Sequence, residues 1–166
     1  MKPVYTTKRI NHLESDTPKT LIVPKIEKPE AKRTYDENGY RHRAVAIVRN
    51  DKNEILLASS IKYENSFILP GGGIDENELP ERAVVREVLE EAGVEAEIEY
   101  FLCELIYDEK KQHIWLFQLK SISETDDHLD KQMFGRCRKW VSLQEARERL
   151  LFSKPVQLQI LDLLKN

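Results

Sequence analysis

The sequence predicts one domain of the α/β or α+β class, in which strands combine with a central helix and C-terminal helices. Three observations predict this. The chain has 166 residues, of which 40% are hydrophobic, enough for one well-buried domain and short for two. Segments with the period of a strand alternate with segments of helical period along the chain. Apolar runs of about eighteen residues, the length that a membrane span needs, are absent.

The N-terminal segment, residues 1–32, differs in composition from the rest. It contains seven Lys or Arg against four Asp or Glu, a charge of +3, which leaves −6 for the remainder of a chain with net charge −3. It also holds four of the seven prolines and shows no sustained period. We expect a flexible or extended arm outside the core, either a plain solubilising tail or a contact for a polyanion.

The first strands form a predicted hairpin. The apolar run from Arg43 to Asn50 and the run from Glu54 to Ser60 flank a polar turn that contains Asp51 and Asn53. A short strand, residues 66–69, follows. It leads into three consecutive glycines, residues 71–73, where the backbone must turn tightly or approach another group closely.

A helix is predicted from Pro80 to Ala92. Proline suits the first helical turn, and Gly93 is placed to end the helix at its carboxyl terminus. Four small or aliphatic residues recur at helical spacing and are expected to pack inward: Ala83, Val84, Val88 and Ala92.

The second half of the chain begins with another predicted hairpin. Residues 95–107 and 113–120 have strand character and surround a polar turn. An acidic loop from Glu124 to Asp130 follows. The two cysteines, Cys103 and Cys137, lack the spacing of a zinc or redox site and have apolar or aromatic neighbours, so we expect buried free thiols.

The C-terminal part is predicted to contain a short strand and two helices. The strand is RKWV, residues 138–141. The first helix begins with a capping-box pattern at Ser142 and Glu145. The second is expected from Pro155 to Leu164, with Ser153 as its candidate N-cap.

The helix after the glycines carries the most informative charges. Glu87 lies three and four residues before Glu90 and Glu91, so the three carboxylates share one face. At about 5.5 Å and an effective dielectric constant near 20, each pair repels by roughly 3 kcal/mol. A solvated acidic face is one interpretation. The other is a site for a hard divalent cation, Mg²⁺ or alternatively Mn²⁺, since carboxylate oxygens are the preferred ligands of such ions.

The pattern around this helix is longer than the carboxylates. It reads G-x5-E-x7-R-E-U-x-E-E-x-G-U, where U is aliphatic, and every specified position is met between Gly72 and Val94. The chain therefore resembles the Nudix hydrolases. The resemblance implies that residues 33–166 form an α/β/α sandwich around a mixed sheet with C-terminal helices. It also implies a metal-dependent hydrolase of diphosphate linkages.

The resemblance assigns metal ligands on this motif. It implies that Glu87 and Glu91 bind the metal and that backbone at the glycines, at Gly71, completes the shell. Glu78 is left with two roles, as a further metal ligand or as the partner of an arginine. Phosphoryl transfer depends mainly on positioning and on charge stabilisation by metal ions, which agrees with such a site.

The resemblance also assigns the catalytic side chains. Glu90 is expected to be the general base that activates a water molecule. Arg86 is expected to orient a neighbouring carboxylate through a bidentate pair rather than to touch the substrate. The two assignments place the bond-cleaving chemistry on a single helix.

Segments outside the motif carry a closer resemblance, to the diphosphoinositol polyphosphate phosphohydrolases. The matching pieces are RTYDENGYRHR, a Ser-Ser pair, PGGG, GRCRKW and KPVQ. Cations gathered from separate loops suit a substrate with many phosphates. The resemblance implies that eight residues bind it: Arg33, Arg41, Arg43, Ser60, Lys62, Lys110, Arg136 and Lys154.

The chain departs from that subfamily at three places. Phe67 stands where tryptophan is usual. Lys62 and Lys110 stand where arginines are usual, so bidentate phosphate contacts become point charges. The turn before His113 also differs from the basic turn of the subfamily. These departures bear on affinity and substrate preference rather than on the chemistry.

The sequence thus predicts an enzyme that removes the β-phosphate of diphosphoinositol polyphosphates and also cleaves diadenosine polyphosphates. One alternative is hydrolysis of capped RNA or of another nucleoside diphosphate derivative. An alternative of another class is a catalytically silent module that binds inositol phosphates. We expect a monomer with a polyphosphorylated small-molecule substrate and no membrane contact. We expect it in the cytoplasm, with the nucleus as a second location.

Overall fold

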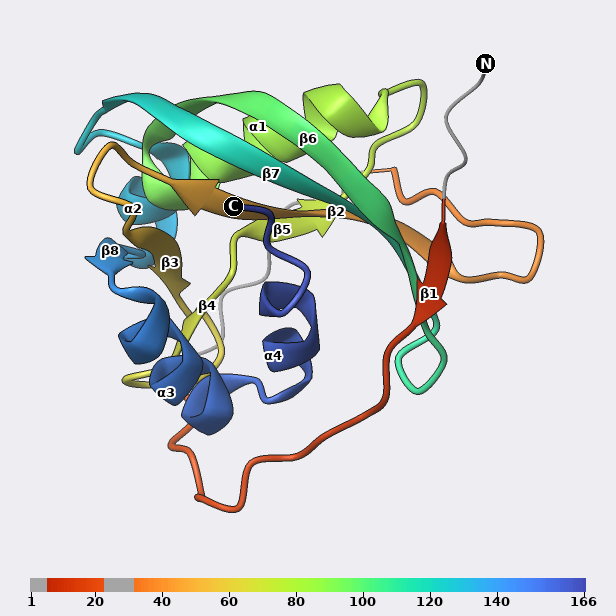
Figure 1. The fold of residues 1–166 in the computed structure, drawn as a ribbon, viewed down its shortest axis with the longest axis horizontal. Coiled ribbons are helices and arrows are strands. Elements are labelled where there is room, and N and C mark those ends of the chain that lie inside the picture. The colour runs from red at the N-terminus through yellow and green to blue at the C-terminus, as the bar shows by residue number, and fades with distance from the viewer. Residues whose placement is uncertain (1–5, 23–31) are drawn as a thin grey trace.

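The structure is a computed structural model that describes residues 6–22 and 32–166, and it confirms the predicted fold class (Figure 1). Part of the predicted arm, residues 1–5 and 23–31, lies outside the described residues. In chain order the elements are β1 (Thr7–Arg9), β2 (Arg41–Arg49), β3 (Ile55–Ser59), β4 (Phe67–Ile68), β5 (Gly71–Gly73), α1 (Pro80–Ala92), β6 (Val94–Tyr107), β7 (Gln112–Glu124), α2 (Leu129–Phe134), β8 (Arg138–Val141), α3 (Leu143–Ser153) and α4 (Val156–Leu161).

The described strands form one mixed sheet. Its order is β1-β6-β7-β2-β3-β4, with β5 paired to β2 and β8 paired to β3. The pairs β1/β6 and β2/β7 are parallel, and the others are antiparallel. Both predicted hairpins, β2/β3 and β6/β7, are confirmed. β2 therefore lies inside the sheet, between β7 on one side and β3 and β5 on the other.

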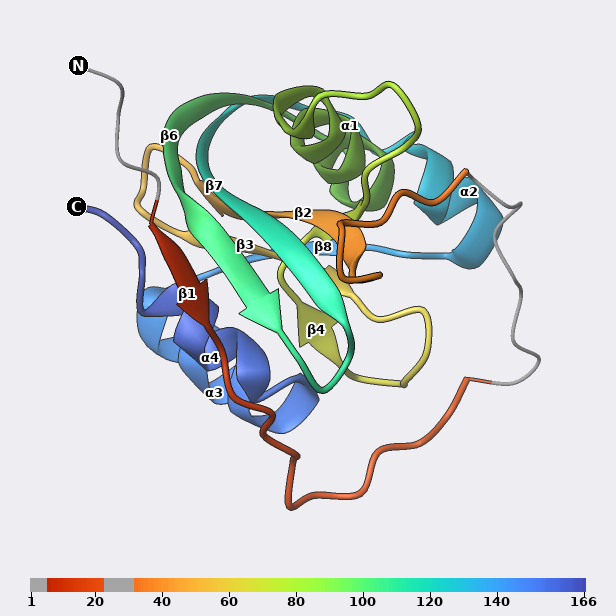
Figure 2. The same cartoon turned by 90° about the vertical axis from the view of Figure 1, so that its right-hand side faces the viewer.

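Helices cover both faces of the sheet. α1 packs on one face, and α3 and α4 pack on the other (Figures 1 and 2). The side chains of β2 alternate between the two cores. Val45 belongs to the core under α3 and α4, whereas Ala44 and Ala46 belong to the core under α1. By the same alternation Arg41 and Arg43 project to the face of α3 and α4.

α1 has the predicted bounds and buried face. Pro80 occupies its first turn, and the Gly93 N–H donates to Leu89 at its end. Gly93 adopts the left-handed conformation with φ 68°, which favours glycine because it lacks a Cβ. The four residues predicted to pack inward are fully buried, and Glu87 and Glu91 are buried beside them.

The three glycines do not form the tight turn that was one of the two expectations. They form β5, which pairs antiparallel with β2. The other expectation, a close approach, is confirmed. A Cβ built on Gly71 would lie 2.6 Å from the carbonyl oxygen of Ala44 and 2.9 Å from the Cα of Val45. Glycine is needed here because the neighbouring backbone fills the space that a side chain would occupy.

The C-terminal helices differ from prediction in their caps. Ser142 caps α3 by accepting from the N–H of Glu145. The Glu145 carboxylate instead accepts from Arg149, so half of the capping box is formed. The prediction of Ser153 as cap of the last helix is wrong. Ser153 ends α3, and its hydroxyl accepts from the N–H of Phe67, which draws it away from α4.

α2 was not predicted, because six residues are too few to show a helical period. It begins at the end of the segment that was predicted to be an acidic loop. The two thiols are free as predicted. Cys103 is buried, but Cys137 is exposed, so its predicted burial is wrong. Cys137 lies just before β8, where its backbone bonds to Ser59 and its side chain remains at the surface.

The N-terminal segment contributes to the domain in the region that the structure describes. Residues 7–9 form β1 at the edge of the sheet beside β6. Ile10 is only 6% exposed and belongs to the core under α3 and α4. The expectation that this segment stays outside the core therefore fails at Ile10, because its apolar side chain gains burial there. The boundary between residues 32 and 33 stays a prediction.

Candidate active site

Arg86 of α1 organises the acidic part of the candidate site. Its guanidinium donates to both oxygens of Glu78, from Nε at 2.7 Å and from NH2 at 2.9 Å. NH1 donates to Glu87 at 2.9 Å and to Glu90 at 3.2 Å, and NH2 reaches the Gly73 carbonyl at 3.1 Å. One cation thus joins the helix, the strand β5 and the loop between them.

The pair of Arg86 and Glu78 is bidentate. Hydrogen bonding to Glu78 raises the pKa of Arg86 above its ordinary value, and the bond from Arg86 lowers the pKa of Glu78. Glu78 also accepts from the N–H of Asp75 at 3.0 Å. Of the two roles expected for Glu78, the geometry favours the partner of Arg86. Its role as a metal ligand stays a prediction.

Two further carboxylates of the motif, those of Glu87 and Glu91, lie against β5. Glu87 is 7% exposed and Glu91 is 3% exposed. The N–H of Gly71 donates to Glu91 at 3.0 Å. A Cβ on Gly72 would come within 2.4 Å of the Glu87 carboxyl carbon. The glycines therefore let two buried carboxylates approach the strand backbone directly.

This donor set fits a hard divalent cation. Among residues 6–22 and 32–166, no three His, Cys, Asp or Glu side chains lie together as a complete metal site. Mg²⁺ usually takes only one or two carboxylates and completes its shell with waters and substrate phosphates. Glu87 and Glu91 would supply these carboxylates, and the Gly71 N–H donates to Glu91, which places the backbone of Gly71 beside that carboxylate. Glu87 already pairs with Arg86 and Glu91 with Arg136, and a cation would neutralise the negative charge that remains among these buried carboxylates.

The contact between Gly72 and Glu87 gives a first prediction. Gly72→Ala is expected to displace the Glu87 carboxylate, which lies at the end of a flexible side chain, and so to cost little stability. The Mg²⁺ concentration for half-maximal activity should rise by about tenfold or more. Metal titration of activity and the thermal unfolding midpoint measure the two effects.

Gly73→Ala is the matched comparison, because the same methyl group would meet Arg41 at 2.4 Å instead of a carboxylate. It should raise KM and leave the Mg²⁺ requirement unchanged. Equal effects of the two substitutions on the Mg²⁺ requirement would contradict the assignment of Glu87.

The glutamates Glu78, Glu87, Glu90 and Glu91 form what we call the carboxylate row. Arg86 binds the first three of them, and Arg136 is buried beside the fourth, Glu91. Its Nε donates to the Ser59 carbonyl at 2.6 Å, and NH1 lies 3.2 Å from Asp130 and 3.4 Å from Glu91. Its side chain is 5% exposed. Arg136, predicted to bind the substrate, therefore contacts Glu91, predicted to bind the metal. The buried carboxylates of Glu91 and Asp130 balance the charge of Arg136.

Arg41 and Arg43 lie at the centre of a cluster of cationic side chains, which we call the cationic group. Burial, followed by the charges of Arg43 and Arg33, lowers the pKa of Arg41. Burial also lowers the pKa of Arg43, whose NH2 lies 3.4 Å from the Gly71 carbonyl. The Nε atoms of both side chains are buried and have no hydrogen-bond partner among the described residues. Two buried donors are thus left for an anionic ligand.

Lys154, which follows α3, extends this group. Burial, then the charge of Arg43 and those of Lys110 and Arg136, lower the pKa of Lys154 to about 7, against the opposing effect of Glu91. The structure therefore brings together predicted substrate residues from three separate segments, namely Arg41 and Arg43, Arg136, and Lys154. Their mutual repulsion favours binding of a polyanion.

The remaining predicted contacts lie at the periphery. Arg33, Lys62 and Lys110 are exposed. Arg33 pairs with Asp75 through a backbone bridge. The hydroxyl of Ser60 accepts from the N–H groups of Lys62 and Tyr63, and so shapes its own loop.

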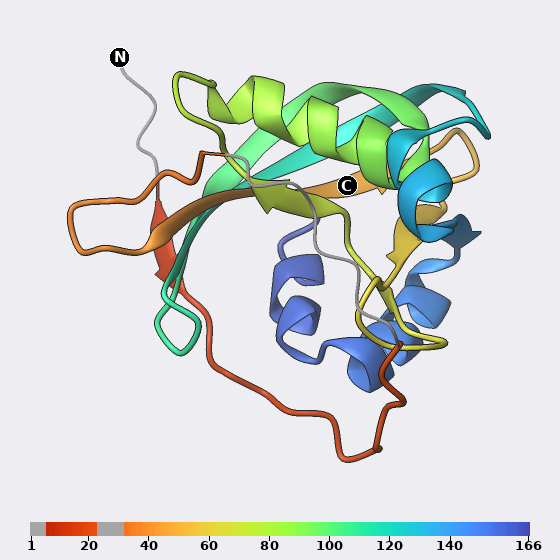
Figure 3. The same cartoon turned by 180° about the vertical axis from the view of Figure 1, so that it is seen from behind.

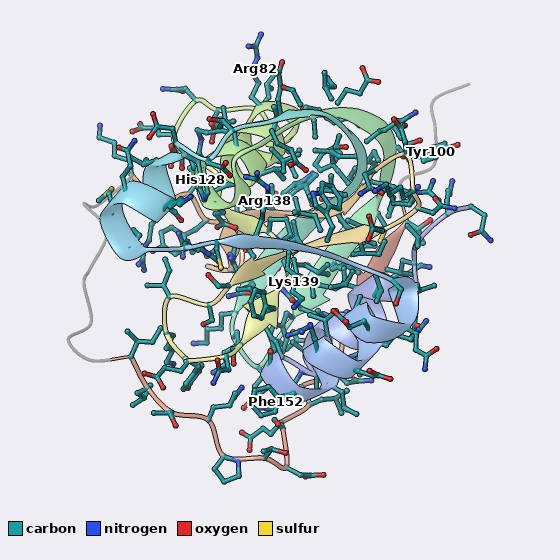
Figure 4. The ribbon with its side chains drawn as sticks, turned by 90° about the vertical axis from the view of Figure 1, so that its left-hand side faces the viewer. Arg82, Tyr100, His128, Arg138, Lys139 and Phe152 are labelled. Atoms are coloured by element: carbon teal, nitrogen blue, oxygen red, sulfur yellow. The ribbon has the colours of Figure 1, made fainter. Side chains whose placement is uncertain are left out.

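Two neighbours of Arg136 have other tasks. Arg138 and Lys139 point to opposite sides of β8 (Figure 4). Arg138 donates to the carbonyls of Ala92 and Thr125, so it supports the end of α1. Lys139 lies over the ring of Phe67, 5.9 Å from its centroid. The basic segment GRCRKW thus supplies only Arg136 to the carboxylate row.

Sequence reasoning missed two supporting groups. Asp130, which pairs with Arg136, was placed in a loop, and only a buried arginine without a local partner could have signalled it. His113 lies 2.9 Å from Asp36 and 2.9 Å from Glu104. His113 thereby attaches the loop that carries Arg33 to the sheet. The sequence had given no basis for assigning a role to His113.

Comparison with known proteins agrees with this geometry. Residues 39–163 match the NUDIX domain family. The chain is 36% identical over 141 residues to diphosphoinositol polyphosphate phosphohydrolase 3-alpha of Mus musculus, with 83% of this chain and 86% of the relative covered. It is 35% identical over 140 residues to diphosphoinositol polyphosphate phosphohydrolase 2 of Homo sapiens, with 83% and 78% covered.

A solved structure supports the fold alone. The NUDIX hydrolase from Nitrosomonas europaea has a TM-score of 0.59 and 23% identity, with 74% of this chain and 86% of that chain covered.

No helix among the described residues has the length and apolar content to cross a membrane. The motif on α1, the family match and the curated relatives agree, and the chain belongs to the Nudix hydrolases, pyrophosphohydrolases that generally use divalent ions such as Mg²⁺.

Proposed function

We propose that this enzyme removes the β-phosphate of diphosphoinositol polyphosphates and also cleaves diadenosine polyphosphates. The observation that carries the proposal is the pair of buried Nε donors on Arg41 and Arg43 without partners in the described chain. Leaving such a donor unsatisfied costs about 1–3 kcal/mol. Phosphate oxygens would satisfy both donors, and Lys154 beside them adds a third cationic side chain.

The proposal divides the work between two groups of residues. Glu87 and Glu91, with the Gly71 backbone, would hold Mg²⁺, which neutralises charge on the phosphoryl oxygens when bound. Glu90 would accept the proton of the attacking water, and Arg86 would keep Glu90 and Glu87 in place through its hydrogen bonds. The cationic group would hold the phosphates that do not react.

One aromatic pocket beside the motif lies apart from the cations, which would hold the phosphates of an inositol substrate. His42 and Trp115 line a pocket of about 240 Å³ together with Asp75 and Glu78. Because strand side chains alternate, His42 lies on the opposite face of β2 from Arg41 and Arg43. A base in that pocket would lie across the sheet from the cations. The names of the curated relatives support the same substrate class.

A substrate panel tests the proposal. Hydrolysis of a diphosphoinositol pentakisphosphate, diadenosine hexaphosphate and capped RNA should be measured with and without Mg²⁺, as inorganic phosphate for the first substrate and as the nucleotide products for the other two. We expect Mg²⁺-dependent turnover of the first two, with kcat/KM highest for the diphosphoinositol. A higher kcat/KM for capped RNA would reject it. Binding of the inositol without turnover of any substrate would identify the silent module instead. We expect the active species to be a monomer.

The cationic group gives a prediction on selectivity. Arg41→Ala combined with Arg43→Ala should raise KM for the diphosphoinositol more than for capped RNA, because loss of several charge-assisted hydrogen bonds matters most to the ligand whose phosphates are crowded on one ring. Loss of one charge-assisted hydrogen bond usually weakens binding by about tenfold or more.

Arg49→Ala is the matched control, since it removes the same charge from the far end of β2, where Arg49 pairs with Glu99. It should leave both KM values unchanged. An equal loss on both substrates in the double variant would count against the inositol assignment.

A further inference from the structure

Part of the N-terminal segment crosses the C-terminal face of the domain. We call residues 11–22 the N-terminal strap. It runs from β1 past α4 and α3 to the loop of residues 60–66 (Figures 2 and 3). At its start, the N–H of Asn11 donates to the Gln159 side chain at 2.9 Å, and that side chain donates back to the Asn11 carbonyl at 2.7 Å. The strap is therefore fastened to α4.

The other end of the strap pairs with the 60–66 loop. The N–H of Glu64 donates to the Thr20 carbonyl at 2.8 Å, and the N–H of Ile22 donates to the Lys62 carbonyl at 3.0 Å. Leu21 and Tyr63 form an antiparallel bridge. The loop that carries Ser60 and Lys62 is thus braced by a segment that lies about forty residues earlier in the chain.

Lys19 joins this loop to the end of α3. Its ammonium group donates to the Ser153 carbonyl at 2.6 Å and lies 4.7 Å from the centroid of the Tyr63 ring. Ser153 immediately precedes Lys154, and Tyr63 immediately follows Lys62. One side chain therefore contacts the neighbour of each of two predicted substrate lysines.

We propose that Lys19 is a positioning residue that fixes Lys62 and Lys154 relative to each other for a polyphosphorylated substrate. The inference rests on the proposed function for its substrate. Lysine side chains are flexible, and fixing the backbone that carries them lowers the ordering cost of binding. The Lys19 ammonium is held by a carbonyl and a ring, so it acts through its neighbours rather than on the phosphates.

The test uses the full chain with Lys19→Met, which removes the donor and keeps the aliphatic stem. Amide hydrogen exchange at Ile22 and Glu64 should become about tenfold faster, because loss of one hydrogen bond eases local opening. KM for the diphosphoinositol should rise by roughly three- to tenfold, with kcat unchanged, because the carboxylates of α1 are untouched. Lys19→Arg, which keeps a donor and a cation, should restore both.

Two further variants separate positioning from charge and from general destabilisation. Lys8→Met removes the same charge from exposed β1 and should change neither exchange in the loop nor KM. Ile22→Pro removes the N–H that pairs with Lys62 while it keeps every charge, and should reproduce the faster exchange at Glu64 and the rise in KM. Exchange in β2 and β7 reports on the whole domain and should stay unchanged.

Three results would overturn the inference: unchanged exchange in the 60–66 loop, an equal rise in KM with Lys8→Met, or a fall in kcat at constant KM. Failure of the proposed function would look different. The wild type would then not hydrolyse the diphosphoinositol. Amide exchange in the 60–66 loop would still show whether Lys19 braces that loop. KM would be measured on whichever substrate of the panel the wild type cleaves.

Discussion

Glu90→Gln is expected to lower kcat by roughly 10²- to 10⁴-fold, the usual contribution of a general base. Glutamine keeps the size of the side chain and one oxygen that can accept from Arg86, which now donates to Glu90 at 3.2 Å. It cannot take a proton from water. Because the Glu90 side chain is 29% exposed and lies at the rim of the carboxylate row, the substitution should leave the fold and the binding of polyanions intact.

Single-turnover kinetics with saturating Mg²⁺ and substrate would measure this loss, with direct titration of a non-hydrolysable inositol hexakisphosphate as the binding measurement. Glu81→Gln, an exposed change in the first turn of the same helix, is the control and should keep full activity. Retention of kcat in Glu90→Gln would remove Glu90 as the base and direct attention to its neighbours on α1.

Arg136→Met is expected to cause the largest loss of stability. It would leave the carboxylates of Asp130 and Glu91 buried without the guanidinium that now lies 3.2 Å and 3.4 Å from them. Breaking a buried ion pair in this way costs about 3–5 kcal/mol, which corresponds to roughly 6 to 20 °C in the unfolding midpoint of a domain of this size. Thermal unfolding followed by circular dichroism would measure it.

Arg82→Met, the same change at an exposed position of α1, should shift the unfolding free energy by less than about 0.5 kcal/mol. Addition of Asp130→Asn to Arg136→Met should recover part of the lost stability, because the two residues are coupled. A variant of normal stability with a raised KM would instead support the direct substrate contact that the family resemblance implies for Arg136.

The elements with strong local signals could be predicted from the sequence. α1 follows from the period of Ala83, Val84 and Val88 together with the glycine at its end, and its bounds are as expected. Glu87, Glu90 and Glu91 share this helix, so their common face also follows from spacing alone. Local information was sufficient there.

Features that depend on contacts distant in sequence could not be predicted. The three glycines have the composition of a turn, and only their pairing with β2 makes them a strand. Asp130 and Arg136 are close in the chain, but their meeting with Glu91 requires α2 to pack beside α1. The contact of Ile10 with the core likewise depends on the parallel pairing of β1 with β6.

The alternation of side chains along β2 has an evolutionary consequence. Arg41, Arg43 and Val45 share one face of this strand, and every residue from Ala44 to Val48 is buried on one face or the other. Insertion or deletion of one residue would turn both arginines toward α1 and exchange the contents of the two cores. Homologues of this enzyme can therefore vary in the identity of residues in β2, but the length of this segment should be held constant by selection.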